Sequence, residues 1–105
     1  MGDRSFVVLL QVHLFFPESG SLKAKRAELN RVKAHLRNRH GASVAEVDHQ
    51  DRRQRSTLAV ALSGGSPGRC ENAADDVGRY LDAHFPQGAR VERRLASWSD
   101  LDLLG

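Results

Sequence analysis

A nearly continuous apolar run at residues 6–16 constrains the fold more than any other stretch of this sequence. One of its two alternating phases, from Phe6 to Leu14, is entirely apolar, whereas the other is interrupted by Gln11 and His13. Polar breaks on one side alone are typical of a central strand whose opposite face is fully buried. We therefore predict that residues 6–16 form a central strand of a sheet with one open face.

The remaining segments alternate between helical and strand periods. We predict helices over residues 21–39 and 66–84, and strands over residues 43–49, 55–63 and 89–98. Ser21 and Ser66 are predicted N-caps, and Gly41 is a predicted helix stop. The order β-α-β-β-α-β predicts an α+β, ferredoxin-like split βαβ fold, a four-stranded antiparallel sheet with two helices on one face. Right-handed crossovers place the first and third strands in its centre.

The totals indicate one domain over residues 1–105, with a core over about 6–98 and a loosely held tail over 99–105. The single cysteine, Cys70, excludes a disulfide framework and fits a reducing cytosol, so we expect a cytoplasmic protein. It falls at a core position of the second helix, where we expect a buried structural thiol. No apolar run reaches the roughly 18 residues of a membrane span, and we expect no membrane contact.

Positive charge is concentrated in the first predicted helix. Residues 21–39 contain seven basic residues and one acid, a net +6, whereas the whole chain is +3 and the remainder therefore −3. Such a helix can contact nucleic-acid phosphates. The alternative is a solvated surface helix whose late cations complement the helix dipole.

The open face of the sheet argues against one mode of RNA binding. RRM domains stack bases on aromatic side chains of the two central strands. Here the central positions hold Gln11 and His13 on the first strand and small residues on the third, with no aromatic. We therefore expect any RNA contact to use a helix or a loop.

The same face suggests self-association. Small side chains allow a second sheet to approach closely, and apolar ones leave area to be covered. We expect a homo-oligomer, most simply a dimer, with an interface formed by Val7, Leu9, Thr57, Ala59 and Ala61. The alternative is a monomer whose C-terminal tail folds over the sheet. Trp98 is expected to plug the sheet edge.

A third cluster holds Glu46, Asp48, His49 and Asp51. Glu46 and Asp48 are predicted to share a strand face with His13, and such groups can bind a divalent metal or act as acid and base. No dense ligand motif accompanies them. The favoured interpretation is that the carboxylates pair with arginines of neighbouring strands, namely Arg55, Arg90 or Arg94.

Four stretches together resemble a known bacterial family. They are residues 21–26 (SLKAKR), 43–51 (SVAEVDHQD), 54–55 (QR) and 58–60 (LAV), which look like those of the YlxP-like family, a domain of unknown function. The resemblance covers residues 6–98 and implies a ferredoxin-like fold. Genes of members lie beside genes for translation initiation and ribosome maturation, which implies a ribosomal or RNA partner by association. Where the family carries an apolar residue and a tryptophan, this chain has Arg52 and Arg53.

The sequence thus predicts a non-enzymatic binding protein that contacts RNA or a ribosomal subunit electrostatically, with little base readout. The alternative is a homo-oligomeric or small-ligand module that uses the open sheet face. No catalytic residue, metal site or cofactor is predicted. The predicted nucleic-acid-binding residues are Lys23, Lys25, Arg26, Lys33, Arg37, Arg52, Arg53 and Arg55.

Overall fold

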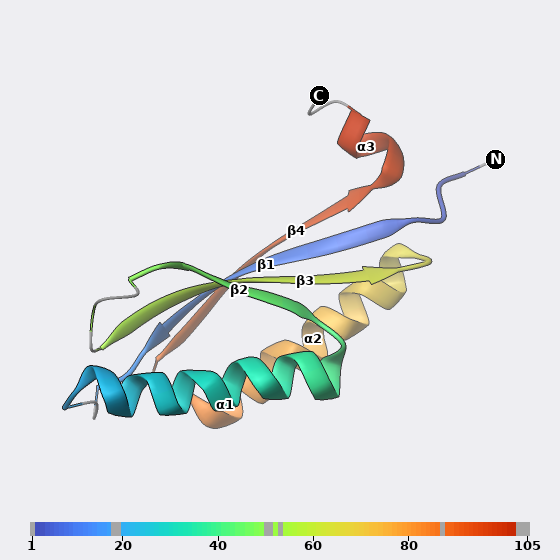
Figure 1. The fold of residues 1–105 in the computed structure, drawn as a ribbon. Coiled ribbons are helices and arrows are strands. Elements are labelled where there is room, and N and C mark those ends of the chain that lie inside the picture. Colours follow the sequence, from blue (N-terminus) through green and yellow to red (C-terminus); the bar gives the residue numbers. More distant parts are fainter. Residues whose placement is uncertain (1, 18–19, 50–51, 53, 87, 103–105) are drawn as a thin grey trace.

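A computed structural model describes residues 2–17, 20–49, 52, 54–86 and 88–102 (Figure 1). The elements are β1 (Phe6–Phe15), α1 (Leu22–His40), β2 (Ser43–Asp48), β3 (Arg55–Gly64), α2 (Pro67–His84), β4 (Ala89–Ser97) and α3 (Trp98–Asp102). The strands form one antiparallel sheet in the order β2-β3-β1-β4. The predicted ferredoxin-like arrangement, with the first and third strands in the centre, is confirmed.

The core lies between the sheet and the two long helices, which cover the same face of the sheet (Figure 1). The alternating residues of β1 from Val8 to Leu14 are buried, as are their partners of the same phase in β3, from Leu58 to Leu62. Helix α2 contributes Cys70, Ala74, Val77 and Leu81 to this core. Cys70 is fully buried, and this burial raises the pKa of its thiol, so the predicted structural thiol is confirmed.

Side-chain and backbone caps fix the ends of the helices. The Ser21 hydroxyl accepts a hydrogen bond from the Ala24 amide at 3.1 Å, and the Ser66 hydroxyl accepts one from the Arg69 amide at 3.2 Å. Gly41 adopts the left-handed conformation (φ 64°) that ends α1. The predicted caps and the predicted stop are therefore confirmed.

The buried stripe of α1 differs from the prediction at one important place. Its members are Lys25, Leu29, Val32 and Leu36, so Lys25, predicted to lie on the basic surface, is buried, whereas Leu22 is exposed. Spacings of four, three and four residues put these four side chains on one line of the helix. A lysine therefore occupies a core position at the start of α1.

The C-terminal tail is more ordered than predicted. Residues 98–102 form the short helix α3, whose start is held by reciprocal hydrogen bonds between Ser97 and Asp100. Ser99 donates to Asp3, so α3 lies beside the start of β1 rather than over the sheet (Figure 1). Trp98 is 67% exposed and does not plug the sheet edge. No helix in the described part of the chain is long and apolar enough to cross a membrane.

Candidate nucleic-acid interface

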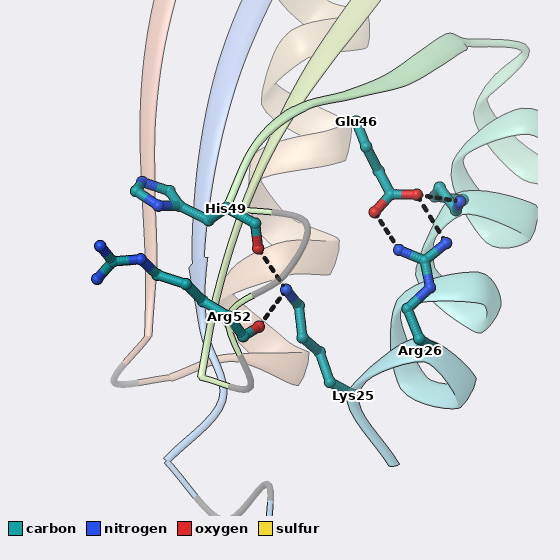
Figure 2. A network of polar contacts seen from close by, with 6 residues as sticks. Lys25, Arg26, Glu46, His49 and Arg52 are labelled. Carbon is teal, nitrogen blue, oxygen red and sulfur yellow. Dashed lines mark hydrogen bonds and ion pairs between the residues drawn. The ribbon is translucent and has the colours of Figure 1, made fainter. Parts of the chain in front are cut away.

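Lys25 lies inside the protein rather than on the predicted basic surface. Its side chain is 0% exposed, and its ammonium donates to the His49 carbonyl at 2.6 Å and to the Arg52 carbonyl (Figure 2). A buried ammonium is tolerated where polar partners replace its water. The prediction that Lys25 contacts nucleic acid is therefore wrong, because the residue fastens the loop after β2 to α1.

Arg26 and Lys33 bind the same carboxylate of β2. The Arg26 guanidinium forms two hydrogen bonds with Glu46, at 2.5 and 2.9 Å, and the Lys33 ammonium lies 2.8 Å from Glu46 Oε2 (Figure 2). The hydrogen bond from Arg26, with that from Lys33, lowers the pKa of Glu46 from 4.5 to about 2 against the opposing effect of burial. The expectation that Glu46 forms ion pairs with arginines of neighbouring strands is wrong. The backbone of Glu46 lies opposite that of Leu58, so its side chain is on the face of the sheet that the helices cover.

Arg37 covers the outer edge of β2. Its guanidinium donates to the Val44 carbonyl at 2.8 Å. Strand β2 is an edge strand, and a cation bonded to its outward carbonyl blocks the addition of another strand. Of the five α1 residues predicted to bind nucleic acid, Lys23 alone has no bond to β2 or its loop among the described residues.

A hollow of about 590 Å³ lies at the end of the open sheet face, beside the loop that Lys25 holds. Its lining includes His13, Phe15, His49, Arg55, Thr57 and Arg90. Figure 2 shows the side chains of His49 and Arg52 pointing away from α1 while their carbonyls turn toward Lys25. His49 has φ 61°, an uncommon backbone conformation for a non-glycine residue, so its position is imposed by the bonds around it.

His13 is fixed at the floor of this hollow by two hydrogen bonds. Its Nε2 donates to the Glu92 carboxylate at 2.8 Å, and its Nδ1 shares a bond of 3.2 Å with the Thr57 hydroxyl. The bond from His13, helped by the charge of Arg90, lowers the pKa of Glu92. Register places His13 opposite both Thr57 and Arg90, which brings three strands together at this point.

Of the predicted site residues, Arg55 is exposed and lines the hollow, Arg52 is exposed in the loop that Lys25 holds, and Arg53 lies outside the described residues. Sequence reasoning assigns His13 and His49 only to metal or acid–base chemistry. For Arg90 the sequence predicts only ion pairing, because no local pattern predicts the strand register that places it opposite His13. Phe15 could have been found, because the alternation of β1 places it on the open face.

The metal or acid–base alternative for Glu46, Asp48 and His49 requires these side chains to lie on one face with His13. A β-bulge between Glu46 and Asp48 places Asp48 opposite Thr57, on the open face, while Glu46 faces the helices. The prediction that Glu46 and Asp48 share a face with His13 is therefore wrong for Glu46. Asp51 lies outside the described residues. Within the described ranges, no three histidine, cysteine or acidic side chains are grouped as metal ligands.

The predicted oligomer interface is exposed only in part. Leu9 is 48% exposed, and Val7, Ala59 and Ala61 are half-buried on the open face. Thr57 is 3% exposed and is hydrogen-bonded to His13. The expectation that Thr57 contributes to an interface is therefore wrong, since its side chain is already covered within one chain.

The chain is similar to known proteins in both sequence and structure. A family described as "Protein of unknown function (DUF503)" matches residues 7–94. The uncharacterised protein YlxP of Bacillus subtilis (strain 168) is 32% identical over 77 residues, which cover 73% of this chain and 83% of that protein.

Two solved structures share the fold at low sequence identity. The de novo designed protein Foldit4 has a TM-score of 0.56 at 14% identity and covers 88% of this chain and 96% of its own. The crystal structure of 30S ribosomal protein S6 from Thermotoga maritima has a TM-score of 0.51 at 9% identity and covers 94% of each chain. At these identities the likeness concerns the fold alone.

Replacing Glu46 by glutamine is expected to destabilise the protein in a pH-dependent way. The pKa of Glu46 is depressed in the fold, so its contribution is fully present above about pH 4.5 and is lost as the pH falls toward 2. We expect a loss of about 2 kcal/mol at neutral pH, less than the full pKa shift implies because Arg26 is partly exposed. Urea unfolding from pH 7 to pH 3 should show the two proteins converging, and a constant difference would contradict this account.

Replacing Lys25 by methionine is expected to release the loop after β2. Methionine fills a similar volume but leaves the carbonyls of His49 and Arg52 without this donor, at a cost of about 1–3 kcal/mol. The amide of Arg52, which donates to His49 at 3.2 Å, should exchange its hydrogen faster. The matched control is Lys23→Met, two residues away and exposed, which should change neither quantity; equal effects of both variants would show that Lys25 has no special role.

Proposed function

Because the chain belongs to the DUF503 family, as its resemblance to YlxP-like sequences predicted, and this family is described only as proteins of unknown function, we propose a function from the geometry of the chain itself. The protein binds RNA, alone or within a ribosomal particle, through an electrostatic contact centred on the loop end of the open sheet face. The contact is formed by Lys23, Arg52 and Arg55, with Arg90 beside them. The proposal involves no catalytic step.

The observation that carries this proposal is the division of the cations into two groups. Lys25, Arg26 and Lys33 bond to β2 and its loop, which removes much of their capacity to bind phosphate. Lys23, Arg52 and Arg55 are exposed and have no ion-pair partner among the residues that the structure describes. Unpaired arginines and lysines are the groups that contact nucleic-acid phosphates.

These three residues come from segments that Lys25 joins. Lys23 lies in the first turn of α1 with Lys25, and the Lys25 ammonium reaches the loop that carries Arg52. Arg55 begins β3, directly after this loop. The interior bonds thus support a group of free charges at one end of the molecule.

The opposite charge of α2 gives the molecule a preferred orientation toward a polyanion. The exposed side of α2 carries Asp75, Asp76 and Asp82, and Arg93 of β4 is neutralised by Glu71 and Asp75 at 2.7 and 3.0 Å. Asp76 is paired with Arg79 on the same helix, so α2 offers phosphates less positive charge than the opposite end of the molecule rather than a strongly repelling surface. Such an asymmetric field steers an anionic partner toward the cationic end.

Charge reversal tests the proposal. A Lys23→Glu, Arg52→Glu, Arg55→Glu variant is expected to lose RNA or ribosomal-subunit binding at low salt. The slope of log affinity against log salt should become less negative by about 0.7 for each single-strand phosphate that the variant no longer neutralises. The control is Arg4→Glu, Arg31→Glu, Arg69→Glu, which changes the net charge equally at exposed sites elsewhere. Sedimentation of both variants with RNA measures the effect; equal weakening in both would leave only a non-specific charge effect and would contradict the proposal.

The second candidate is self-association through the apolar part of the open face. Leu9 is exposed there, and Ala45 and Ala59 form a directly opposed small pair that lets a second sheet approach. This interface is compatible with RNA binding because the cationic end lies beyond it.

An arginine at position 59 tests this second candidate. If the open faces pack together, Ala59→Arg should convert a salt-insensitive dimer into a monomer, as measured by sedimentation equilibrium. Arg69→Ala, on an exposed helix surface, is the control and should leave the molecular mass measured for the dimer unchanged. A wild-type protein that is monomeric at every concentration would exclude this interface.

A further inference from the structure

Phe15 is an aromatic side chain at the end of the open face, whose central positions were predicted to hold no aromatic. It is the last residue of β1, a central strand, and the alternation of that strand turns it away from the helices. Its side chain is 39% exposed, and it pairs in register with Arg55. It lines the hollow together with His13, His49 and Arg90. An exposed aromatic ring is thus surrounded by cationic and hydrogen-bonding groups.

We propose that this hollow binds one unpaired nucleotide of a single-stranded RNA, with its base stacked on the Phe15 ring and its phosphates against Arg55, beside Arg90, whose guanidinium lies 3.9 Å from the Glu92 carboxylate. The proposal rests on the RNA-binding function proposed above and specifies the form of RNA that is bound. Aromatic side chains stack on any base, and arginines beside them bind the backbone, which is the usual combination in single-strand binding. The volume of about 590 Å³ lies in the range of sites that hold small ligands.

The backbone around Phe15 is fixed before any ligand arrives. The Phe15 amide donates to the Gly88 carbonyl at 2.7 Å, and a side chain at position 88 would place its Cβ 2.7 Å from the Phe15 carbonyl oxygen. Only glycine permits this approach of β4 to the end of β1. The ring therefore belongs to a rigid strand end, which lowers the ordering cost of binding.

The polar groups of the hollow favour stacking over sequence readout. Both ring nitrogens of His13 are already bonded, to Thr57 and to Glu92, so they are not free to read a base edge. His49, held in its unusual backbone conformation at the rim, presents a partly exposed ring. We infer a site that accepts several bases, because a π-face is common to all of them.

Geometry also separates single strands from duplexes. A base within an A-form helix is stacked and paired, so it cannot lie against Phe15 unless it is splayed out. Duplex RNA can still approach the surrounding arginines through its phosphates. The hollow therefore predicts a preference for single strands that charge alone does not give.

The test compares Phe15→Leu with the wild-type protein by fluorescence anisotropy, with a labelled oligouridine and a labelled duplex of equal length as probes. We expect Phe15→Leu to weaken oligouridine binding roughly tenfold. The affinity for the duplex and the slope of log affinity against log salt should remain unchanged. Phe15→Tyr should bind oligouridine as tightly as the wild type does. The control Trp98→Leu removes the exposed tryptophan at the other end of the sheet and should have no effect.

The outcomes separate this inference from the proposed function. Salt-dependent binding of RNA that is unaffected by Phe15→Leu, or equal for single strands and duplexes, would overturn the stacking site and leave the electrostatic function standing. No binding of either RNA at low salt would overturn both. Matching circular dichroism melting curves for Phe15→Leu and the wild type ensure that a loss of binding is not a loss of folding.

Discussion

The ammonium group of Lys25 lies where a residue of α1 would ordinarily be apolar, in line with Leu29, Val32 and Leu36. A charge in such a place must be surrounded by polar atoms, and the carbonyls of His49 and Arg52 turn inward to meet it. This requirement sets the path of the loop after β2. The inward turn of its carbonyls leaves the side chains of His49 and Arg52 directed to the open face of the sheet (Figure 2). The candidate interface therefore depends on the ammonium group of Lys25, which is itself buried.

The positive charge of α1 divides into structural and available parts. Arg26 and Lys33 share one carboxylate, Glu46, and Arg37 covers the edge of β2. These contacts attach the helix to the edge strand β2. The formal charge of a segment therefore overstates what a partner can reach, because each buried or paired cation is neutralised locally. Lys23, Arg31 and Arg39 remain exposed on α1, and Lys23 lies in the same turn as Lys25, which holds the loop that carries Arg52.

The fold could be predicted from sequence because its signals are local. The one-sided polar breaks of β1 and the caps at Ser21, Gly41 and Ser66 each depend on a few neighbouring residues. The site could not be predicted in the same way. The pairing of Glu46 with α1 depends on the face that β2 turns to the helices, and the position of Asp48 depends on a bulge. Lys25 was predicted to lie on the surface because it is a lysine, although its spacing from Leu29 and Val32 places it in the buried stripe of α1.

The strand pairing of β1 has a consequence for synthesis of the chain. Its first residue, Phe6, lies opposite Ser97 of β4, so the sheet closes across almost the full length of the polypeptide. Strand β1 is synthesised before the other strands of this sheet, yet its second neighbour, β4, is synthesised after them. During that interval the most apolar segment of the protein has one unpaired edge, a state that favours association between nascent chains. Emergence of β4, rather than formation of the first helix, is therefore the moment at which both edges of β1 are paired.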